Sequence, residues 1–224
     1  MQNIKDKVAL ITGATKGIGY GIAETLLKQG VKVAITSRTQ ESADEAAKKL
    51  GKNVLAIAAD VKDFKSQQDA LAKTIEKFGA LDFLIANAGV GHFAAIDELT
   101  VEDWQETINT NLTGVFYSVK AAVDALKKSK GYIITISSLA GTNFFENGSA
   151  YNASKFGLTG FTQAIMLDLR KHDVKVSTIM PGSVATHFAE HTPDKEKRCL
   201  ENSTRRYWAI SKRFVEYESA DFTK

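Results

Sequence analysis

A tyrosine and a lysine, Tyr151 and Lys155, lie four residues apart in the stretch SAYNASKFGL, residues 149–158. In a helix this spacing places both side chains on one face, one turn apart. A neighbouring ammonium group stabilises phenolate, so we expect the pKa of Tyr151 to fall from its reference of about 10. A tyrosine tuned in this way can exchange a proton with an alcohol or carbonyl oxygen. The alternative is a pair of surface neighbours, because the same spacing also occurs by chance.

Three glycines form a second pattern in the stretch Gly13-Ala-Thr-Lys-Gly17-Ile-Gly19. They lie between an apolar, β-branched run and an amphipathic stretch, as in a strand-to-helix connection. Glycines let the backbone approach a diphosphate, whose charge the start of the following helix stabilises. The spacing differs from the general G-x-G-x-x-G fingerprint. The alternative is a tight turn without a ligand, but the position after the first strand favours phosphate binding.

Short apolar runs alternate with amphipathic stretches from residue 7 to residue 179. The pattern predicts strands at 7–12, 31–36, 54–59, 81–86, 132–136 and 174–179. It predicts helices at 20–29, 41–50, 65–78, 100–128 and 150–172. Such alternation is typical of an α/β domain in which helices cover both faces of a parallel sheet. Ligands of these sheets bind at the carboxyl ends of the strands.

The totals describe an ordinary globular chain of 224 residues, 44% hydrophobic and 25% charged. A net charge of +3 is too small to indicate a nucleic acid or membrane partner. The single cysteine, Cys199, excludes an internal disulfide and fits a reducing compartment. The chain has no run of 18 apolar residues and no signal-peptide pattern at its start, so we expect a cytoplasmic protein.

Seven motifs resemble those of the short-chain dehydrogenase/reductase family in its single-domain form. In chain order they are TGATKGIG (12–19), DV (60–61), NAG (87–89), Asn111, ISS (136–138), Tyr151-x-x-x-Lys155 and PGSVAT (181–186). The similarity spans residues 5–188 and is greatest to 3-oxoacyl-carrier-protein reductases and to carbonyl or sugar reductases. It implies a Rossmann-like doubly wound sheet and hydride transfer between a nicotinamide cofactor and a carbonyl or secondary alcohol.

The resemblance assigns roles to four residues. Tyr151 is the proton donor, and Lys155 lowers its pKa and binds the nicotinamide ribose hydroxyls. Ser138 holds the substrate oxygen, with Ser137 as the alternative. Asn111 supports a water relay toward the lysine, and its alternative is an ordinary surface asparagine.

Cofactor contacts are implied along the carboxyl ends of the strands. Asp60 accepts from the adenine amino group, Val61 contacts adenine, and residues 87–89 line the adenosine ribose. Val184 and Thr186 resemble the residues that hold the carboxamide. The complete set of expected cofactor residues is Gly13, Thr15, Lys16, Gly17, Ile18, Gly19, Ser37, Arg38, Asp60, Val61, Asn87, Ala88, Gly89, Tyr151, Lys155, Pro181, Gly182, Val184 and Thr186.

The choice of cofactor can be interpreted from charge. Enzymes that use NAD(H) usually place an acid at the end of the second strand to bind the ribose 2′-hydroxyl. Here the segment is Thr36-Ser37-Arg38, without an acid. Arg38 can bind a 2′-phosphate through its forked guanidinium, and Lys16 adds a second cation. We therefore favour NADP(H), with NAD(H) and two solvated surface charges as the alternatives.

Other candidate residues carry less weight. His187 and His191 have a spacing that can ligate zinc on a helix, but no third ligand is evident, so no metal site is expected. His92 either contacts substrate or flanks a loop. Phe144 and Phe145 either shape the substrate mouth or pack in the core.

Residues 190–224 depart from the preceding pattern. All 16 glycines lie before this segment, and charged clusters such as DKEKR appear within it. We predict a dinucleotide-binding and catalytic domain at 1–189 and an atypical tail at 190–224, whose best candidate for a seventh strand is 213–217. One interpretation is a reading-frame shift near 195–200, because the next frame can encode a family-like ending that includes PEDI. The alternative is a native C-terminus, and the coding DNA distinguishes the two.

The favoured function is therefore an oxidoreductase. The alternatives are a non-catalytic dinucleotide sensor or scaffold and an enzyme impaired by its altered tail. The intact Ser138, Tyr151 and Lys155 favour the enzyme, because a sensor needs no proton donor. We expect a small-molecule substrate and a homodimer or homotetramer formed through the two long helices, with the tetramer dependent on the tail.

Overall fold

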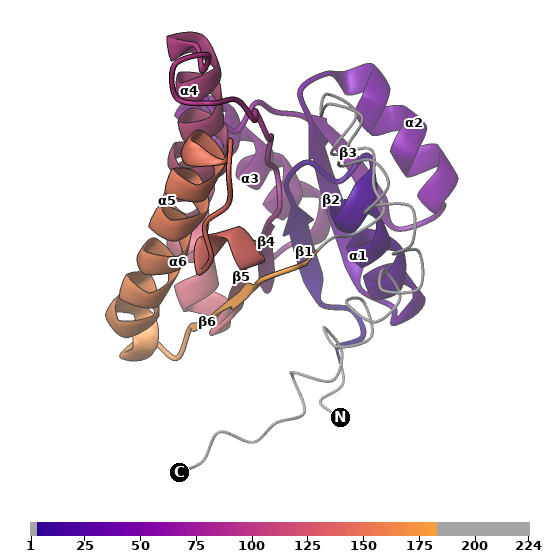
Figure 1. Cartoon of the computed structure of the whole chain (residues 1–224). Coiled ribbons are helices and arrows are strands. Elements are labelled where there is room, and N and C mark those ends of the chain that lie inside the picture. Colours follow the sequence, from indigo (N-terminus) through magenta and orange to yellow (C-terminus); the bar gives the residue numbers. More distant parts are fainter. Residues whose placement is uncertain (1–3, 183–224) are drawn as a thin grey trace.

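The computed structural model describes residues 4–182, which form one six-stranded sheet with helices on both faces (Figure 1). The strands are β1 (Val8–Ile11), β2 (Lys32–Ser37), β3 (Val54–Ala58), β4 (Phe83–Ala86), β5 (Tyr132–Ile136) and β6 (Lys175–Ile179). The helices are α1 (Gly17–Lys28), α2 (Gln40–Leu50), α3 (Phe64–Phe78), α4 (Val101–Ile108), α5 (Gly114–Ser129) and α6 (Ser149–Arg170). Two short segments, η1 (Asn109–Thr113) and η2 (Leu139–Gly141), complete the described elements.

Every pair of neighbouring strands is parallel, in the order β3-β2-β1-β4-β5-β6. The chain builds outward from β1 to β3, returns to the centre at β4, and then builds outward on the other side. The predicted Rossmann-like doubly wound sheet is therefore confirmed. Its direction of winding reverses between β1 and β4, where such sheets open a crevice at the carboxyl ends of the strands.

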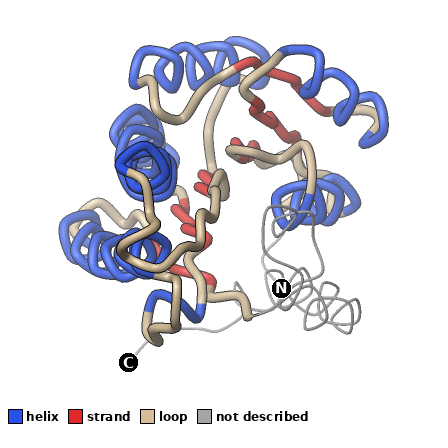
Figure 2. Tube along the Cα trace, turned by 45° about the horizontal axis from the view of Figure 1, so that its top comes forward, coloured by secondary structure: helices blue, strands red, loops and turns tan. Residues whose placement is uncertain are grey.

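Helices lie on both sides of the strands (Figure 2), and a hydrophobic core lies on each face of the sheet. Alternate residues of β1 serve opposite faces: Leu10 belongs to the core beneath α3, α5 and α6, and Ile11 belongs to the core beneath α1 and α2. Burial of both faces explains why the strands are continuous apolar runs rather than alternating ones.

The prediction of one continuous helix at 100–128 is wrong in one respect, because three consecutive segments, α4, η1 and α5, occupy this stretch. Thr100 caps α4 as expected, its Oγ1 accepting from the Asp103 N–H at 3.1 Å. The helix then widens into the π-helical segment η1, and the Gly114 N–H donates to the Asn109 carbonyl five residues earlier. Such widened turns are rare and frequently occur at functional sites. Asn111, one of the predicted site residues, lies within η1.

The first helix also begins earlier than predicted, at Gly17 rather than at residue 20. Gly17 and Gly19 therefore belong to the first turn of α1. Glycine lowers helix propensity, which is why periodicity alone placed the start later.

No helix within residues 4–182 is long and apolar enough to cross a membrane. The predicted boundary after residue 189, the candidate strand at 213–217 and the reading-frame interpretation all concern residues outside the described range, and they stay predictions.

Candidate active site

Four predicted residues converge at the carboxyl ends of β4 and β5. Tyr151 and Lys155 project from α6, and the Lys155 Nζ lies 5.6 Å from the centroid of the Tyr151 ring. Ser138, the second residue after β5, is hydrogen-bonded to Tyr151. Gly89 lies between Asn111 and Lys155, because a Cβ built on it would be 3.2 Å from the Asn111 Oδ1 and 3.8 Å from the Lys155 Nζ.

The electrostatics of Tyr151 differ from the sequence-based expectation. Burial raises the pKa of Tyr151 above its ordinary value, and the hydrogen bond with Ser138 offsets only part of that rise. The expected fall in the pKa of Tyr151 through Lys155 is therefore corrected. The physical reason is that desolvation disfavours the phenolate, while Lys155 directs its own hydrogen bond to the Ile136 carbonyl at 2.9 Å.

Lys155 is itself almost completely buried, with 4% of its surface exposed. Burial lowers the pKa of Lys155 to about 8, because the charged ammonium loses its hydration. Both members of the pair are thus shifted toward their neutral forms by the same enclosure.

Asn111 is fully buried, so the alternative of a surface asparagine is excluded. Its Oδ1 accepts from the Val90 N–H at 2.8 Å, and its Nδ2 donates to the Val90 carbonyl at 2.8 Å. The same Nδ2 donates to the Ser154 Oγ at 3.0 Å, and Ser154 donates to the Tyr151 carbonyl at 2.8 Å. Asn111 therefore joins the loop after β4 to the turn of α6 that carries the tyrosine. Ser154, which the sequence reasoning did not single out, completes this connection.

The two serines after β5 have different environments. Ser137 is buried and donates to the Lys155 carbonyl at 3.3 Å, with the Thr159 hydroxyl 3.2 Å away. Ser138 is half-buried, contacts Tyr151, and accepts from the Ala140 N–H at 3.1 Å. Ser138 thus lies beside the phenol, whereas Ser137 packs against the body of α6.

The glycine loop packs directly against the NAG segment. Gly13 has a φ of +63°, and a Cβ on it would be 2.8 Å from the Ala88 Cα. A Cβ on Gly19 would be 2.4 Å from the Asn87 Nδ2. These two positions accept no side chain without displacing their neighbours, so the backbone itself lines the end of β1.

A clamp between Thr12 and Asn87 holds the two segments together. The Asn87 Nδ2 donates to the carbonyls of Thr12 and Gly13 at 2.9 and 3.0 Å. The Thr12 Oγ1 accepts from the N–H groups of Asn87 and Ala88 at 3.0 and 3.1 Å. Thr12 was absent from the predicted site residues, although it opens the glycine motif.

The start of α1 fits a phosphate group. Lys16 occupies the N-cap position without a side-chain cap, and Gly17 follows with a φ of +62°. The first N–H groups of the helix therefore have no capping oxygen from Lys16, and an anion can accept from them. Thr15 and Ile18 flank this turn and are half-buried.

The residues expected at the adenosine end lie after β2 and β3. Ser37 ends β2 and is half-buried, and Arg38 follows it on the surface. The Asp60 Oδ1 accepts from the Lys62 N–H at 2.9 Å. Val61 is largely buried, and a Cβ built on Gly114 would lie 2.8 Å from its Cγ2, so Val61 packs against the start of α5.

Some predicted residues lie outside the described range, namely Val184, Thr186, His187 and His191. Pro181 and Gly182 follow β6, and the Pro181 carbonyl accepts from the Leu139 N–H at 3.0 Å. Within residues 4–182, no three His, Cys, Asp or Glu side chains gather in a way that could hold a metal ion.

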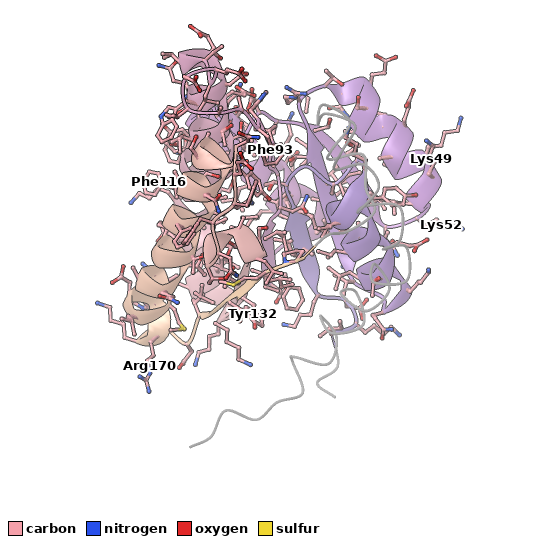
Figure 3. All side chains as sticks on the ribbon, viewed as in Figure 1. Lys49, Lys52, Phe93, Phe116, Tyr132 and Arg170 are labelled. Atoms are coloured by element: carbon pink, nitrogen blue, oxygen red, sulfur yellow. The ribbon has the colours of Figure 1, made fainter. Side chains whose placement is uncertain are left out.

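Aromatic rings surround Tyr151, a feature that the sequence indicated only in part. The centroid of Phe93, labelled in Figure 3, lies 5.4 Å from that of Tyr151 in an edge-to-face arrangement. The Phe145 ring is 6.5 Å from Tyr151 and 5.9 Å from Phe93. Phe144 is 88% exposed, so the alternative of core packing does not apply to it. The His92 Nδ1 lies 3.1 Å from the Asp103 Oδ1, a contact that joins its loop to α4.

Comparison with known proteins agrees with this geometry. The family model for short chain dehydrogenases matches residues 7–197, so the chain belongs to the short chain dehydrogenase family. It is an oxidoreductase of that family, and its relatives are named as dehydrogenases and reductases.

Two relatives illustrate the similarity in sequence. Trans-4-hydroxycyclohexanecarboxylate dehydrogenase of Sinomonas cyclohexanicum is 38% identical over 192 residues, which cover 82% of this chain and 74% of the relative. The 3-oxoacyl-[acyl-carrier-protein] reductase FabG of Escherichia coli K12 is 35% identical over 196 residues, covering 87% and 80%.

Two solved structures illustrate the similarity in fold. The 3-ketoacyl-(acyl-carrier-protein) reductase of Brucella melitensis complexed with NADH has a TM-score of 0.81 at 28% identity, covering 84% of this chain and 80% of the other. The alcohol dehydrogenase of Thermococcus sibiricus complexed with 5-hydroxy-NADP has a TM-score of 0.77 at 32% identity, covering 85% and 82%.

The buried lysine predicts a pH dependence of stability. Between about pH 8 and pH 10 the unfolded chain keeps the Lys155 proton that the folded chain releases, so the free energy of unfolding rises with pH. Below this window both states are protonated and Lys155 adds no slope. Above it, the raised pKa of Tyr151 reverses the sign, because the unfolded tyrosine then loses its proton first.

We expect Lys155→Met to remove roughly 2 kcal/mol of that rise, as measured by urea unfolding at several pH values. The matched control is Lys48→Met, which removes an exposed lysine of α2 and should keep the wild-type slope. Identical slopes in the wild type and Lys155→Met would contradict the assigned shift.

Proposed function

We propose that the protein is an NADP(H)-dependent carbonyl reductase or alcohol dehydrogenase. The observation that carries the proposal is the joining of Ser138, Tyr151 and Lys155 beside the glycine loop, at the point where the sheet reverses its winding. A phenol, a hydroxyl and a buried amine in one crevice can hold a substrate oxygen and move a proton to it.

The residues of the crevice fit a nicotinamide dinucleotide. The uncapped start of α1 would take the diphosphate, and the backbone at Gly13 leaves no side chain in the way. Asp60 would accept from the adenine amino group, and Gly89 would leave room for a ribose beside Asn111 and Lys155. When bound, the nicotinamide supplies or accepts the hydride.

The protein's own part is to hold and deliver a proton. Burial keeps the Tyr151 phenol protonated at neutral pH, so it can donate to a carbonyl oxygen that Ser138 holds by a hydrogen bond. The ammonium of Lys155 then stabilises the phenolate that remains. Asn111 holds the loop after β4 against α6 through its hydrogen bonds, and we propose that it also supports a relay of protons toward Lys155.

We expect Tyr151→Phe to lower kcat by at least about a hundredfold, because the variant keeps the ring and loses the proton. The Kd for NADPH should stay near the wild-type value in a fluorescence titration. Tyr117→Phe is the matched control, since Tyr117 of α5 packs against Phe64 of α3 and against its neighbour Phe116 rather than against Lys155. Near-normal turnover by Tyr151→Phe would end the proposed mechanism.

A panel of ketones and secondary alcohols, assayed with NADPH and NADH, identifies the substrate class. A wild-type protein that binds NADPH tightly and converts none of the panel would favour the alternative functions, a dinucleotide sensor or an enzyme impaired by its tail. The similarity to reductases and to a dehydrogenase of a ring alcohol supports including ring ketones and acyl thioesters in that panel.

The preference for NADP(H) rests on charge at the end of β2. Arg38 is exposed and follows Ser37, and no acid is present where NAD(H)-dependent enzymes usually place one. An arginine can bind a 2′-phosphate through two parallel hydrogen bonds. Lys16, at the cap of α1, is the second exposed cation of the crevice.

We expect Arg38→Asp to raise the KM for NADPH at least about tenfold more than the KM for NADH, because the new carboxylate repels the phosphate and accepts from a free ribose hydroxyl. The control is Arg170→Asp at the far end of α6 (Figure 3), which should change neither KM. Equal effects of Arg38→Asp on both cofactors would remove Arg38 from the phosphate role.

We further propose a homo-oligomer formed through the outer faces of α5 and α6. Large apolar side chains are exposed there, with Phe116 45%, Phe156 44%, Met166 45% and Leu167 67% exposed. Phe116 (Figure 3) also packs edge-to-face on Phe161, so the two helices form one continuous apolar surface. Surfaces of this kind mark protein interfaces.

We expect Phe116→Glu to shift the protein toward monomer in sedimentation velocity, since a charge in an apolar interface is desolvated without a partner. Lys49→Glu on the exposed face of α2 is the control and should leave the oligomer intact. A wild-type protein that sediments as a monomer at micromolar concentration would contradict this interface.

A further inference from the structure

One buried side chain, Asn152, holds the loop between β5 and α6 at three points. Its Nδ2 donates to the carbonyls of Ala140 and Asn143, both at 2.8 Å, and its Oδ1 accepts from the Phe145 N–H at 3.3 Å. Only 8% of Asn152 is exposed, so water does not readily replace these bonds. The residue directly follows Tyr151, yet none of its polar atoms is needed for the proton transfer proposed above.

The loop that Asn152 holds lies against the Tyr151 ring. It includes Ser138 and Phe145, whose ring packs against both Tyr151 and Phe93. Gly148 closes the loop with no room for a side chain, because a Cβ there would be 2.5 Å from the Asn152 Oδ1 and 2.6 Å from the Phe145 Cε2. The Asn152 side chain and the Phe145 ring thus both pack against the backbone of Gly148.

The same loop is joined to the loop after β4. The Ala94 N–H donates to the Asn147 carbonyl at 3.0 Å, and the neighbouring Phe93 ring lies edge-to-face on Tyr151. The two loops therefore form one wall, which we define by Phe93, Phe145 and the Tyr151 ring. A displacement of the β5–α6 loop would be passed to Phe93 through the contacts with Asn147 and Phe145.

We propose that Asn152 is a positioning residue that sets this wall, and that the wall receives an uncharged hydrocarbon part of the substrate beside the reacting carbon. The inference deepens the proposed function and rests on it for the identity of the reaction. The rings of Phe93 and Phe145 carry no charge, and edge-to-face geometry leaves apolar surface beside the phenol. A ring ketone or a branched ketone fits such a wall better than a small, fully hydrated one.

Charged groups lie near the wall but do not form it. Lys155 contacts the Tyr151 ring from within α6, and His92 pairs with Asp103. Glu146, between Phe145 and Asn147 in the loop, is exposed. A charged substrate group would have to reach these residues, whereas a hydrocarbon group needs only the rings.

Four variants test the assignment. Asn152→Ala removes all three hydrogen bonds. Phe145→Ala removes only a ring that is 42% exposed, so it tests the wall with less risk to folding. The double variant combines the two. Asn143→Ala is the matched control, because it removes an exposed asparagine side chain of the same loop and keeps the carbonyl that Asn152 binds.

The first measurement needs no substrate. The packing of Phe93 and Phe145 on Tyr151 predicts that ring currents displace the NMR shifts of the Tyr151 ring protons from their random-coil positions in the wild-type protein. We expect these shifts to move toward random-coil values in Asn152→Ala and Phe145→Ala and to stay unchanged in Asn143→Ala. Unchanged Tyr151 shifts in Asn152→Ala, together with a lowered Tm, would assign Asn152 a purely structural role and overturn the proposal.

The second measurement separates KM from kcat, with cyclohexanone and acetone as the probes and NADPH as the reductant. We expect Asn152→Ala and Phe145→Ala to raise the KM for cyclohexanone about tenfold, with a smaller change for acetone and an unaltered KM for NADPH. The double variant should be no worse than Asn152→Ala, because both act through the same ring. Equal effects on both ketones, or additive effects in the double variant, would overturn the proposal.

A wild-type protein that reduces neither ketone would count against the proposed function and against a hydrocarbon substrate. The NMR comparison still decides whether Asn152 positions the wall. The two failures are therefore distinguishable.

Discussion

The site depends on the hydrogen-bonded contact between the ends of β1 and β4. Thr12 and Asn87 exchange bonds across this contact, each side chain binding the backbone of the other segment. The contact requires backbone to approach backbone, and Gly13 and Gly19 permit it because a Cβ at either position would overlap the NAG segment. Once the two strand ends are joined, the start of α1 and the residues after β4 and β5 face one crevice.

Enclosure, more than the pairing of charges, controls the electrostatics of this crevice. Burial moves the pKa of Tyr151 up and that of Lys155 down to about 8, so each group is charged over a narrower pH range than in water, although Lys155 stays mostly protonated at neutral pH. The wall of Phe93 and Phe145 against the phenol fits this direction, because apolar neighbours disfavour an ionised oxygen. The raised pKa keeps the proton on Tyr151 but makes the phenol a weaker acid, so proton donation depends on a cation close enough to stabilise the product phenolate.

Four of the five residues from Tyr151 to Lys155 have a contact or position of importance to the site. Tyr151 and Lys155 face the crevice, Asn152 binds the β5–α6 loop, and Ser154 binds Asn111 in the widened turn η1. One turn of α6 therefore holds Tyr151, Lys155, the loop after β5 and the loop after β4 in a fixed arrangement. Side chains that do not touch the Tyr151 hydroxyl therefore help to fix the position of this residue.

The sequence by itself determined the α/β class, the parallel sheet and the glycine-rich turn, because periodicity and turn chemistry are local properties. The other residues gathered at the end of the sheet, such as Asn111 and Ser138, were indicated by motifs that resemble those of the family. It did not reveal η1, whose widened turn depends on Asn111 binding Val90 and Ser154, 21 and 43 residues away. Nor did it predict the rise in the pKa of Tyr151 or the separate environments of Ser137 and Ser138. Those properties arise from burial and from long-range hydrogen bonds, which exist only once distant segments are packed together.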